Sequence, residues 1–198
     1  MGSLPDKKIA EFVLGTLQSL YDIQAFVETG TYKGVTTAWA SKYFQDVYTI
    51  DISHDYIAQA KEKLNDVNNI TYLHGDTRNK LKEAASCITK NAIFWLDAHK
   101  GGGYFGDGDD CPIIEEILAI QNFKNEYCIL IDDVRAFLFP PQPPFDYKKW
   151  PTISTILRTL DLKERRFNFI ADDVLISVPE INKELIITEL HKLYPKFY

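Results

Sequence analysis

Acidic side chains directly follow two apolar runs in the middle of this chain. Asp97 comes after the run 92–96, and the pair Asp132-Asp133 comes after the run 127–131. If both runs are neighbouring parallel strands, their carboxyl ends meet at one sheet edge and the three carboxylates converge. Carboxylate oxygens suit Mg²⁺, with Mn²⁺ or Ca²⁺ as alternatives. The pattern favours a metal site; the alternative is that Asp132-Asp133 form a solvated turn and Asp97 caps a loop.

His99, two residues beyond Asp97, is the candidate general base. An unperturbed imidazole pKa near 6.5 suits removal of a proton from a hydroxyl around neutral pH. Two other interpretations stay open for His99: a further metal ligand, or a loop residue bonded to the backbone. Asp97 and His99 are therefore the candidate catalytic residues. The remaining histidines are interpreted as structural or solvent-facing: His54, His74 and His191.

A glycine-containing turn near the N-terminus provides a second group of candidate residues. Residues 26–37 read as a buried strand that ends at Glu28, a turn through Gly30 and Gly34, and the start of a helix. Glycine lets the backbone approach a bound molecule closely, because it lacks a Cβ and tolerates positive φ. Asp51 ends the next apolar run, 21 residues after Gly30, which is about where nucleotide-binding folds hold ribose hydroxyls. Tyr32 replaces the second glycine of the dinucleotide pattern, which disfavours a nicotinamide-dependent oxidoreductase.

Strands and helices alternate along most of the chain. Apolar runs predict strands at 25–28, 47–51, 70–74, 92–96 and 127–131. Helical spacing and capping residues predict helices at 7–20, 35–44, 53–65, 78–87, 112–122 and 152–160. Two short runs, 167–170 and 174–178, flank residues 171–173 and predict a closing hairpin before a last helix at 182–193. The chain is therefore predicted to be one α/β domain over residues 1–198, with its leading helix within residues 1–22.

Two segments next to the acidic strand ends interrupt this alternation. Residues 100–111 are mostly glycine and acid, and we interpret them as a mobile lid over the substrate. A phosphate-cradling loop is disfavoured there, because no Gly-Lys-Ser/Thr follows and the acids would repel phosphate. Residues 137–151 are rich in proline and aromatics and are predicted to form another wall of the site, the alternative being a proline-rich partner ligand. Arg135 either orients an anionic acceptor or forms a surface salt bridge.

The composition narrows the classes of function. With 28 acidic and 22 basic residues the net charge is −6, which argues against a broad basic face for nucleic acid. Three cysteines without a C-x-x-C pair argue against a disulfide or structural zinc framework and fit a reducing compartment. No stretch approaches the about 20 apolar residues of a membrane span. The expectation is a soluble, cytoplasmic protein without a membrane or nucleic-acid partner; a homo-oligomer stays open.

The order of these motifs resembles that of class I S-adenosylmethionine-dependent methyltransferases. The resemblance covers roughly residues 24–178 and depends on the turn at 28–34 and on the following residues: Asp51, His74-Gly75-Asp76, Asp97 and Asp132-Asp133. It implies an α/β fold with a Rossmann-like doubly wound sheet, in which five parallel strands are joined by a C-terminal antiparallel hairpin and helices cover both faces. It also implies S-adenosyl-L-methionine as the cofactor.

The resemblance further implies roles at the cofactor. Gly30 and Gly34 would shape the turn under the amino-acid part of the donor, Glu28 would help to hold it, and Asp51 would accept hydrogen bonds from the ribose. Asp76 would lie near the adenine; the alternative is that it caps the following helix. The predicted cofactor-binding residues are Glu28, Gly30, Thr31, Gly34, Asp51, Asp76, Thr77 and Asp97, and the predicted metal ligands are Asp97, Asp132 and Asp133.

The acceptor side is similar to the metal site of the sugar O-methyltransferases of the macrocin type, from macrolide and aminocoumarin pathways. That similarity implies Mg²⁺-assisted methylation of a hydroxyl on a sugar or natural product. The glycine-rich insertion and the short chain depart from those enzymes, which leaves the acceptor open. A non-catalytic module that binds a nucleotide or S-adenosylmethionine is the rival hypothesis. We expect Asp51→Ala to weaken donor binding, and Asp132→Ala to abolish turnover while leaving donor binding nearly intact.

Overall fold

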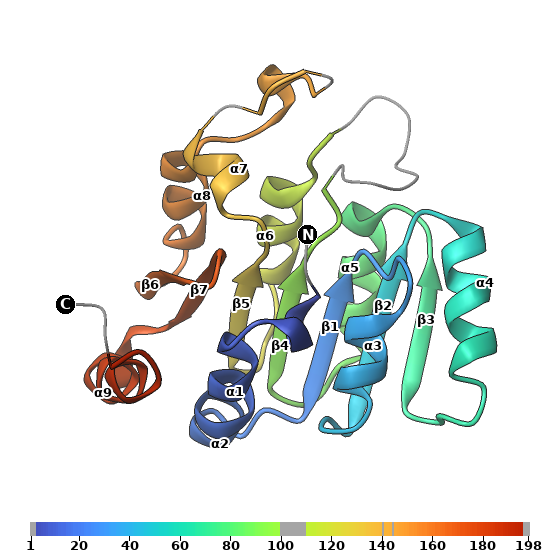
Figure 1. Cartoon of the computed structure of the whole chain (residues 1–198), viewed down its shortest axis with the longest axis horizontal. Coiled ribbons are helices and arrows are strands. Elements are labelled where there is room, and N and C mark those ends of the chain that lie inside the picture. The colour runs from blue at the N-terminus through green and yellow to red at the C-terminus, as the bar shows by residue number, and fades with distance from the viewer. Residues whose placement is uncertain (1–2, 100–109, 140, 144, 196–198) are drawn as a thin grey trace.

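Five parallel strands and an antiparallel hairpin form one mixed sheet. The computed structural model describes residues 3–99, 110–139, 141–143 and 145–195. The strand order is β3-β2-β1-β4-β5-β7-β6 (Figure 1). The strands are β1 (Ala25–Thr29), β2 (Asp46–Asp51), β3 (Ile70–His74), β4 (Ala92–Leu96), β5 (Tyr127–Ile131), β6 (Arg166–Ala171) and β7 (Val174–Pro179). The predicted Rossmann-like sheet with its C-terminal hairpin is therefore confirmed.

The strand order reverses between β1 and β4, and the register aligns the carboxyl ends of the central strands. Thr29, the last residue of β1, lies opposite Ile50 of β2 and Leu96 of β4, and Leu96 lies opposite Ile131 of β5. In doubly wound sheets, ligands bind outside the carboxyl ends of the strands at such a reversal. Residues that directly follow β1, β2, β4 and β5 are therefore placed along one edge.

Helices cover both faces of the sheet. One face carries the leading helical segment, α3 (Val35–Ala40) and α9 (Lys183–Leu193), and the other carries α5 (Thr77–Cys87), α6 (Ile113–Ile120) and α8 (Ile153–Leu160). Helix α4 (His54–Lys63) packs beside β2 and β3 at one end of the sheet (Figure 1). The remaining short segments are η1 (Leu4–Asp6), α7 (Arg135–Leu138), η3 (Tyr147–Lys149) and η4 (Glu180–Asn182). Within the described ranges, no helix combines the length and the apolar character needed to cross a bilayer.

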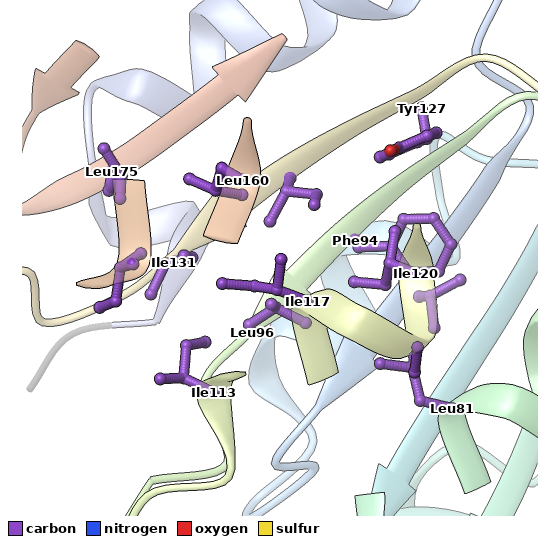
Figure 2. Packing of buried hydrophobic residues seen from close by; sticks show 14 of the residues in the cluster. Leu81, Phe94, Leu96, Ile113, Ile117, Ile120, Tyr127, Ile131, Leu160 and Leu175 are labelled. Carbon is purple, nitrogen blue, oxygen red and sulfur yellow. The ribbon is translucent and has the colours of Figure 1, made fainter. Parts of the chain in front are cut away.

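Helix α6 shows how periodicity places an element on the sheet. Its residues Ile113, Ile117 and Ile120 recur at helical spacing and point onto Phe94 and Leu96 of β4 (Figure 2). All five are buried, as an apolar stripe on a helix facing a core requires. The strands β4 and β5 are buried along their whole length, which explains why their sequences read as continuous apolar runs.

Two helices differ in detail from their predicted form. The leading helix predicted over residues 7–20 is present, but it consists of α1 (Ile9–Phe12), a π-helical stretch (Val13–Leu17) and α2 (Gln18–Leu20). Helix α3 ends at Ala40 instead of Phe44. The side-chain amide of Asn69 donates to the carbonyls of Ser41 and Phe44, at 3.0 and 2.9 Å. These long-range hydrogen bonds satisfy carbonyls at the helix end and hold the chain in a turn there.

Candidate functional site

The turn after β1 requires glycine at position 30. Gly30 has φ +88°, and a Cβ at this position would lie 2.5 Å from the backbone oxygen of Asp97. The turn therefore packs directly against the chain that leaves β4. Gly34 has φ +71° and precedes α3. Both glycines thus adopt the left-handed conformation that glycine tolerates best.

Asp51, at the end of β2, fixes the same turn from the other side. Its Oδ2 accepts a hydrogen bond from the backbone N–H of Tyr32 at 2.9 Å, and its Oδ1 accepts one from Ser53 at 2.8 Å. Tyr32 has φ +43°, a conformation that is uncommon for a residue other than glycine. Burial raises the pKa of Asp51, and these backbone hydrogen bonds counteract the rise. Each carboxylate oxygen has a second lone pair and can accept another hydrogen bond.

Glu28 is buried beneath the turn and is held by threonines. Its Oε2 accepts hydrogen bonds from the hydroxyls of Thr37 at 2.5 Å and Thr49 at 2.7 Å. The hydroxyl of Thr31 lies 2.6 Å from that of Thr49 and extends the network. Burial raises the pKa of Glu28 to about 8, although the threonine hydroxyls oppose the rise. The negative charges of Asp97 and Asp51 also raise the pKa of Glu28, so the three acids are close enough to interact.

Asp76, which follows β3, caps the N-terminus of helix α5. Asp76 accepts the backbone N–H of Arg78 at 2.9 Å as the N-cap of α5, and it also binds the guanidinium of Arg78. These contacts with Arg78 outweigh burial and lower the pKa of Asp76. The capping interpretation is therefore correct, and the predicted approach of Asp76 and Thr77 to an adenine stays a prediction.

A buried acid on α6 was not among the predicted site residues. Glu116 is 1 % exposed, and it faces the side chains of Thr77 and Thr29. Its Oε1 has no hydrogen-bond partner among the described residues. Burial raises the pKa of Glu116 to about 7. No sequence pattern indicates this placement, because Glu115 and Glu116 are adjacent acids on an amphipathic helix and only the packing shows which one faces inward.

Three side chains at the ends of β4 and β5 form a group that could hold a metal ion. Asp97, His99 and Asp133 each offer one ligand atom, and these atoms all lie within 4.8 Å of one another. The Nε2 of His99 is 3.1 Å from Oδ2 of Asp133, and its Nδ1 is 3.9 Å from Oδ1 of Asp97. Backbone hydrogen bonds align the strand ends, since Asp97 N–H donates to Thr29 at 3.1 Å and Asp132 N–H donates to Leu96 at 3.1 Å. Carboxylates and imidazole are common ligands of divalent ions.

The charges in this group shift one another's pKa values. Burial raises the pKa of Asp97 to about 7, and the neighbouring carboxylates of Asp132 and Asp133 add to the rise. Burial alone lowers the pKa of His99, but Asp133 and Asp97 outweigh it, so the pKa is raised. Burial opposes ionisation of Asp133, but His99 and Arg135 outweigh it, so the pKa of Asp133 is lowered. His99 therefore keeps its proton to a higher pH than a free imidazole does, and as a metal ligand or general base it must first lose that proton.

The two consecutive aspartates after β5 have different partners. Asp133 has φ +51°, and its Oδ1 binds the guanidinium of Arg135 at 2.7 Å while its Oδ2 faces His99. The Oδ1 of Asp132 lies 2.8 Å from the ammonium of Lys7. Asp132 is therefore at the predicted strand end, but outside the group formed by Asp97, His99 and Asp133. Arg135 also forms an ion pair with Asp173, which agrees with the salt-bridge interpretation.

Aromatic side chains of the segment 137–151 pack against His99. The ring centroids of Phe137 and Trp150 lie 6.3 and 5.4 Å from that of His99. The Nε1 of Trp150 is buried and has no hydrogen-bond partner among the residues described. Asp110 accepts the backbone N–H of Asp146 at 3.1 Å and connects the two predicted loops. The lid predicted over residues 100–111 lies outside the described residues, apart from Asp110 and Cys111.

The predicted acids thus lie along one sheet edge, and several of their partners come from distant parts of the chain. Thr37, Thr49, Glu116 and Lys7 were not among the predicted residues. Lys7 is 125 positions away from Asp132, and no local sequence signal connects the two. Thr49 could have been identified by its position in the buried strand β2, where a hydroxyl needs a hydrogen-bond partner.

Comparison with known proteins agrees with this geometry. Residues 27–99, from β1 to His99, match a family model described as a methyltransferase domain. No curated protein matches the sequence. The matched stretch contains the Gly30 turn, Asp51, Asp76 and Asp97, and it includes every predicted cofactor-binding residue.

Solved structures share the fold at low sequence identity. A candidate O-methyltransferase from Klebsiella pneumoniae is 17 % identical with a TM-score of 0.55, and the alignment covers 84 % of this chain and 78 % of that one. An SAH-bound methyltransferase from Podospora anserina is 14 % identical with a TM-score of 0.56, over 85 % and 76 % of the chains. An rRNA methylase from Streptococcus thermophilus is 14 % identical with a TM-score of 0.51, over 86 % and 96 %. Residues 27–99 are thus similar to a methyltransferase domain, and the solved structures show that this chain shares the fold of several methyltransferases.

Proposed function

We propose that this protein transfers a methyl group from S-adenosylmethionine to a hydroxyl of a small-molecule acceptor. A divalent cation, most plainly Mg²⁺, assists the transfer. The observation that carries the proposal is the group Asp97, His99 and Asp133, whose ligand atoms lie within 4.8 Å of one another. This group lies beside the turn that is held by Gly30 and Asp51. A donor site and a cation site at adjacent strand ends are what metal-assisted methyl transfer to oxygen requires.

The donor set fits a divalent ion. Two carboxylates and one imidazole supply oxygen and nitrogen ligands, which suit Mg²⁺, Mn²⁺ and related ions. Asp97, His99 and Asp133 would hold the ion, and when bound it would lower the pKa of an acceptor hydroxyl. Because the neighbouring carboxylates raise the pKa of His99, a cation that binds there would compete with a proton.

The chain's own residues would position the two reactants. Gly30 allows the backbone of the turn to approach the donor closely, while Asp51 and Glu28 lie where the ribose and the amino-acid part of the donor would bind. The sulfonium methyl of S-adenosylmethionine is already activated, so most of the acceleration must come from placing the acceptor oxygen in line with it. Phe137 and Trp150 beside His99 would exclude water and provide a flat wall for the acceptor.

A small acceptor is favoured over nucleic acid. The net charge of −6 and the carboxylates at the site would repel a polyanion. Leu138, Phe139 and Tyr147 are exposed on the segment that carries Phe137 and Trp150, and such side chains suit a sugar-bearing or aromatic natural product more than a phosphate backbone. In this proposal the acceptor chemistry is that of the macrocin-type sugar O-methyltransferases, which methylate a hydroxyl with the help of a metal ion.

The test separates an enzyme from a binding module. Calorimetry with S-adenosylmethionine measures donor binding, and incubation with a panel of sugars, catechols and hydroxylated natural products measures formation of S-adenosylhomocysteine with and without EDTA. We expect donor binding and EDTA-sensitive turnover. Donor binding without turnover on any acceptor would favour the non-catalytic module, and turnover that EDTA leaves unchanged would contradict the cation.

A further inference from the structure

The N-terminal segment contributes a charged group to the candidate site. The ammonium of Lys7 lies 2.8 Å from Oδ1 of Asp132, and the side chains of Lys7 and Asp132 are only 11 % and 2 % exposed. Lys7 also donates to the backbone carbonyl of Asp172 at 3.3 Å. Figure 1 shows the N-terminal segment crossing in front of β1 and β4 near their carboxyl ends. A lysine from the start of the chain is thus almost enclosed at the edge where the strand-end acids gather.

The segment that carries Lys7 is anchored on both sides of this residue. Leu4 is fully buried, and its backbone N–H donates to the hydroxyl of Thr36 at 3.3 Å. The backbone N–H of Ile9 donates to Oδ2 of Asp172 at 2.7 Å, and the same oxygen accepts the hydroxyl of Tyr194 at 2.7 Å. Lys7 is therefore held in place by the fold, in contrast to a long side chain that samples solvent.

Asp132 is the strand-end acid that Lys7 pairs with, and it lies apart from the group formed by Asp97, His99 and Asp133. It raises the pKa of Asp97, so the two carboxylates are close enough to interact. It is nevertheless absent from the group whose ligand atoms lie within 4.8 Å of one another. A positive charge beside a buried carboxylate stabilises its ionised form, and the ammonium of Lys7 is such a charge beside Asp132.

We propose that Lys7 is a positioning residue that holds Asp132 in an ion pair and so prevents it from binding a metal. A divalent cation at the site then has Asp97, His99 and Asp133 as its protein ligands. This inference rests on the proposed cation site. The ammonium of Lys7 lies beside Asp132, where a metal ion would otherwise bind, and a cation that does not bind Asp132 would be free to bind the acceptor oxygen.

The proposal predicts that removal of the lysine strengthens metal binding. In Lys7→Met, Asp132 is left without its counter-ion beside three other ligands, and a divalent cation becomes the nearest available positive charge. Affinity of oxygen-rich sites rises with the number of charged ligands, so we expect Mn²⁺ to bind about tenfold more tightly or better. Lys7→Arg keeps the positive charge and should bind Mn²⁺ as the unchanged protein does.

The experiment is calorimetric titration of the full chain with Mn²⁺ alone at pH 8. The matched control is Lys8→Met, which removes the same charge from the neighbouring residue. Lys8 is exposed and contacts Leu193 and Tyr194, so its loss should not change the affinity. The double variant Lys7→Met/Asp132→Asn removes both members of the pair, and its affinity should match the unchanged protein within about twofold.

The outcomes separate this inference from the proposed function. Equal Mn²⁺ affinity in Lys7→Met and the unchanged protein overturns the role of Lys7 and leaves the cation site intact. A double variant that loses affinity as strongly as Asp133→Asn shows that Asp132 is a ligand and also overturns it, even if Lys7→Met does not fold. If neither the unchanged protein nor Lys7→Met binds Mn²⁺, the cation site itself is wrong, and the inference falls with it.

Discussion

The two halves of the carboxyl edge hold their acids in different ways. At the ends of β1 and β2, Glu28 and Asp51 are held by neutral donors, which are threonine hydroxyls and backbone N–H groups. At the ends of β4 and β5, Asp132 and Asp133 are held by cationic side chains. Neutral donors hold a carboxylate in one position but do not compensate its negative charge. Cationic partners compensate that charge and therefore allow several carboxylates to come close together.

This difference indicates where each half can bind its ligand. In the half at β1 and β2, hydrogen bonds from backbone N–H groups to Asp51 hold the path of the turn, which suits recognition of a cofactor by shape. The half at β4 and β5 concentrates negative charge in a partly enclosed space, which suits a divalent cation. The contrast can be tested with variants that affect one half and leave the other unchanged.

The largest effect is expected on turnover, when an acid at the ends of β4 and β5 is replaced. Asp133→Asn removes one ligand of the proposed cation and the main acidic partner of His99. Because a metal acting as a Lewis acid contributes several kcal/mol, we expect kcat to fall by about a thousandfold. Binding of S-adenosylmethionine, measured by calorimetry, should change little. Asp66→Asn, at an exposed position, is the control, and an unchanged kcat in Asp133→Asn would contradict the assignment.

The next largest effect is expected at the glycine turn between the two halves. Gly30→Ala places a methyl group 2.5 Å from the backbone of Asp97 at φ +88°. We expect the free energy of unfolding to fall by about 3 kcal/mol, from backbone strain and crowding, together with loss of donor binding. The matched control is Gly15→Ala, where the added methyl meets nothing within 4 Å. Chemical denaturation that shows equal stability for both variants would remove the structural argument for this turn.

A smaller effect is expected at the end of β2. Asp51→Ala removes the acceptor of the Tyr32 and Ser53 N–H groups and the predicted acceptor of the ribose hydroxyls. Loss of charge-assisted hydrogen bonds should weaken S-adenosylmethionine binding by about tenfold or more, while Mn²⁺ affinity stays unchanged. Asp55→Ala, an exposed acid on α4, is the control. Equal donor affinities for the two variants would exclude Asp51 from the cofactor site.

The smallest effect is a pH dependence of stability from Glu28. Burial raises its pKa to about 8 in the folded protein from an ordinary value of 4.5, so the folded state binds more protons than the unfolded state between these values. The contribution of Glu28 to stability is therefore greatest below about pH 4.5 and falls as the pH rises to about 8. The difference in unfolding free energy between the unchanged protein and Glu28→Gln should decline over that interval. A difference that rises with pH would show that Glu28 is ionised in the folded protein at neutral pH.

The sequence determined the elements and the sheet edge that carries the site. Continuous apolar runs at β4 and β5 predict buried parallel strands, and parallel strands bring their terminal acids to one edge. The sequence therefore predicted that Asp97 and Asp133 lie close together at this edge, as they do. Local rules were also sufficient for Ser53, which caps α4, because a cap depends on residues only a few positions apart.

Only the tertiary structure decided which side chains form hydrogen bonds and ion pairs with these acids. The left-handed conformation at Asp133 gives two adjacent aspartates different neighbours, and no residue pattern showed which would face His99. Glu116 and Lys7 are ordinary charged residues of helical segments until packing buries them. Charge compensation in a protein interior depends on contacts between residues far apart in the sequence, and such contacts are fixed only when the elements pack together.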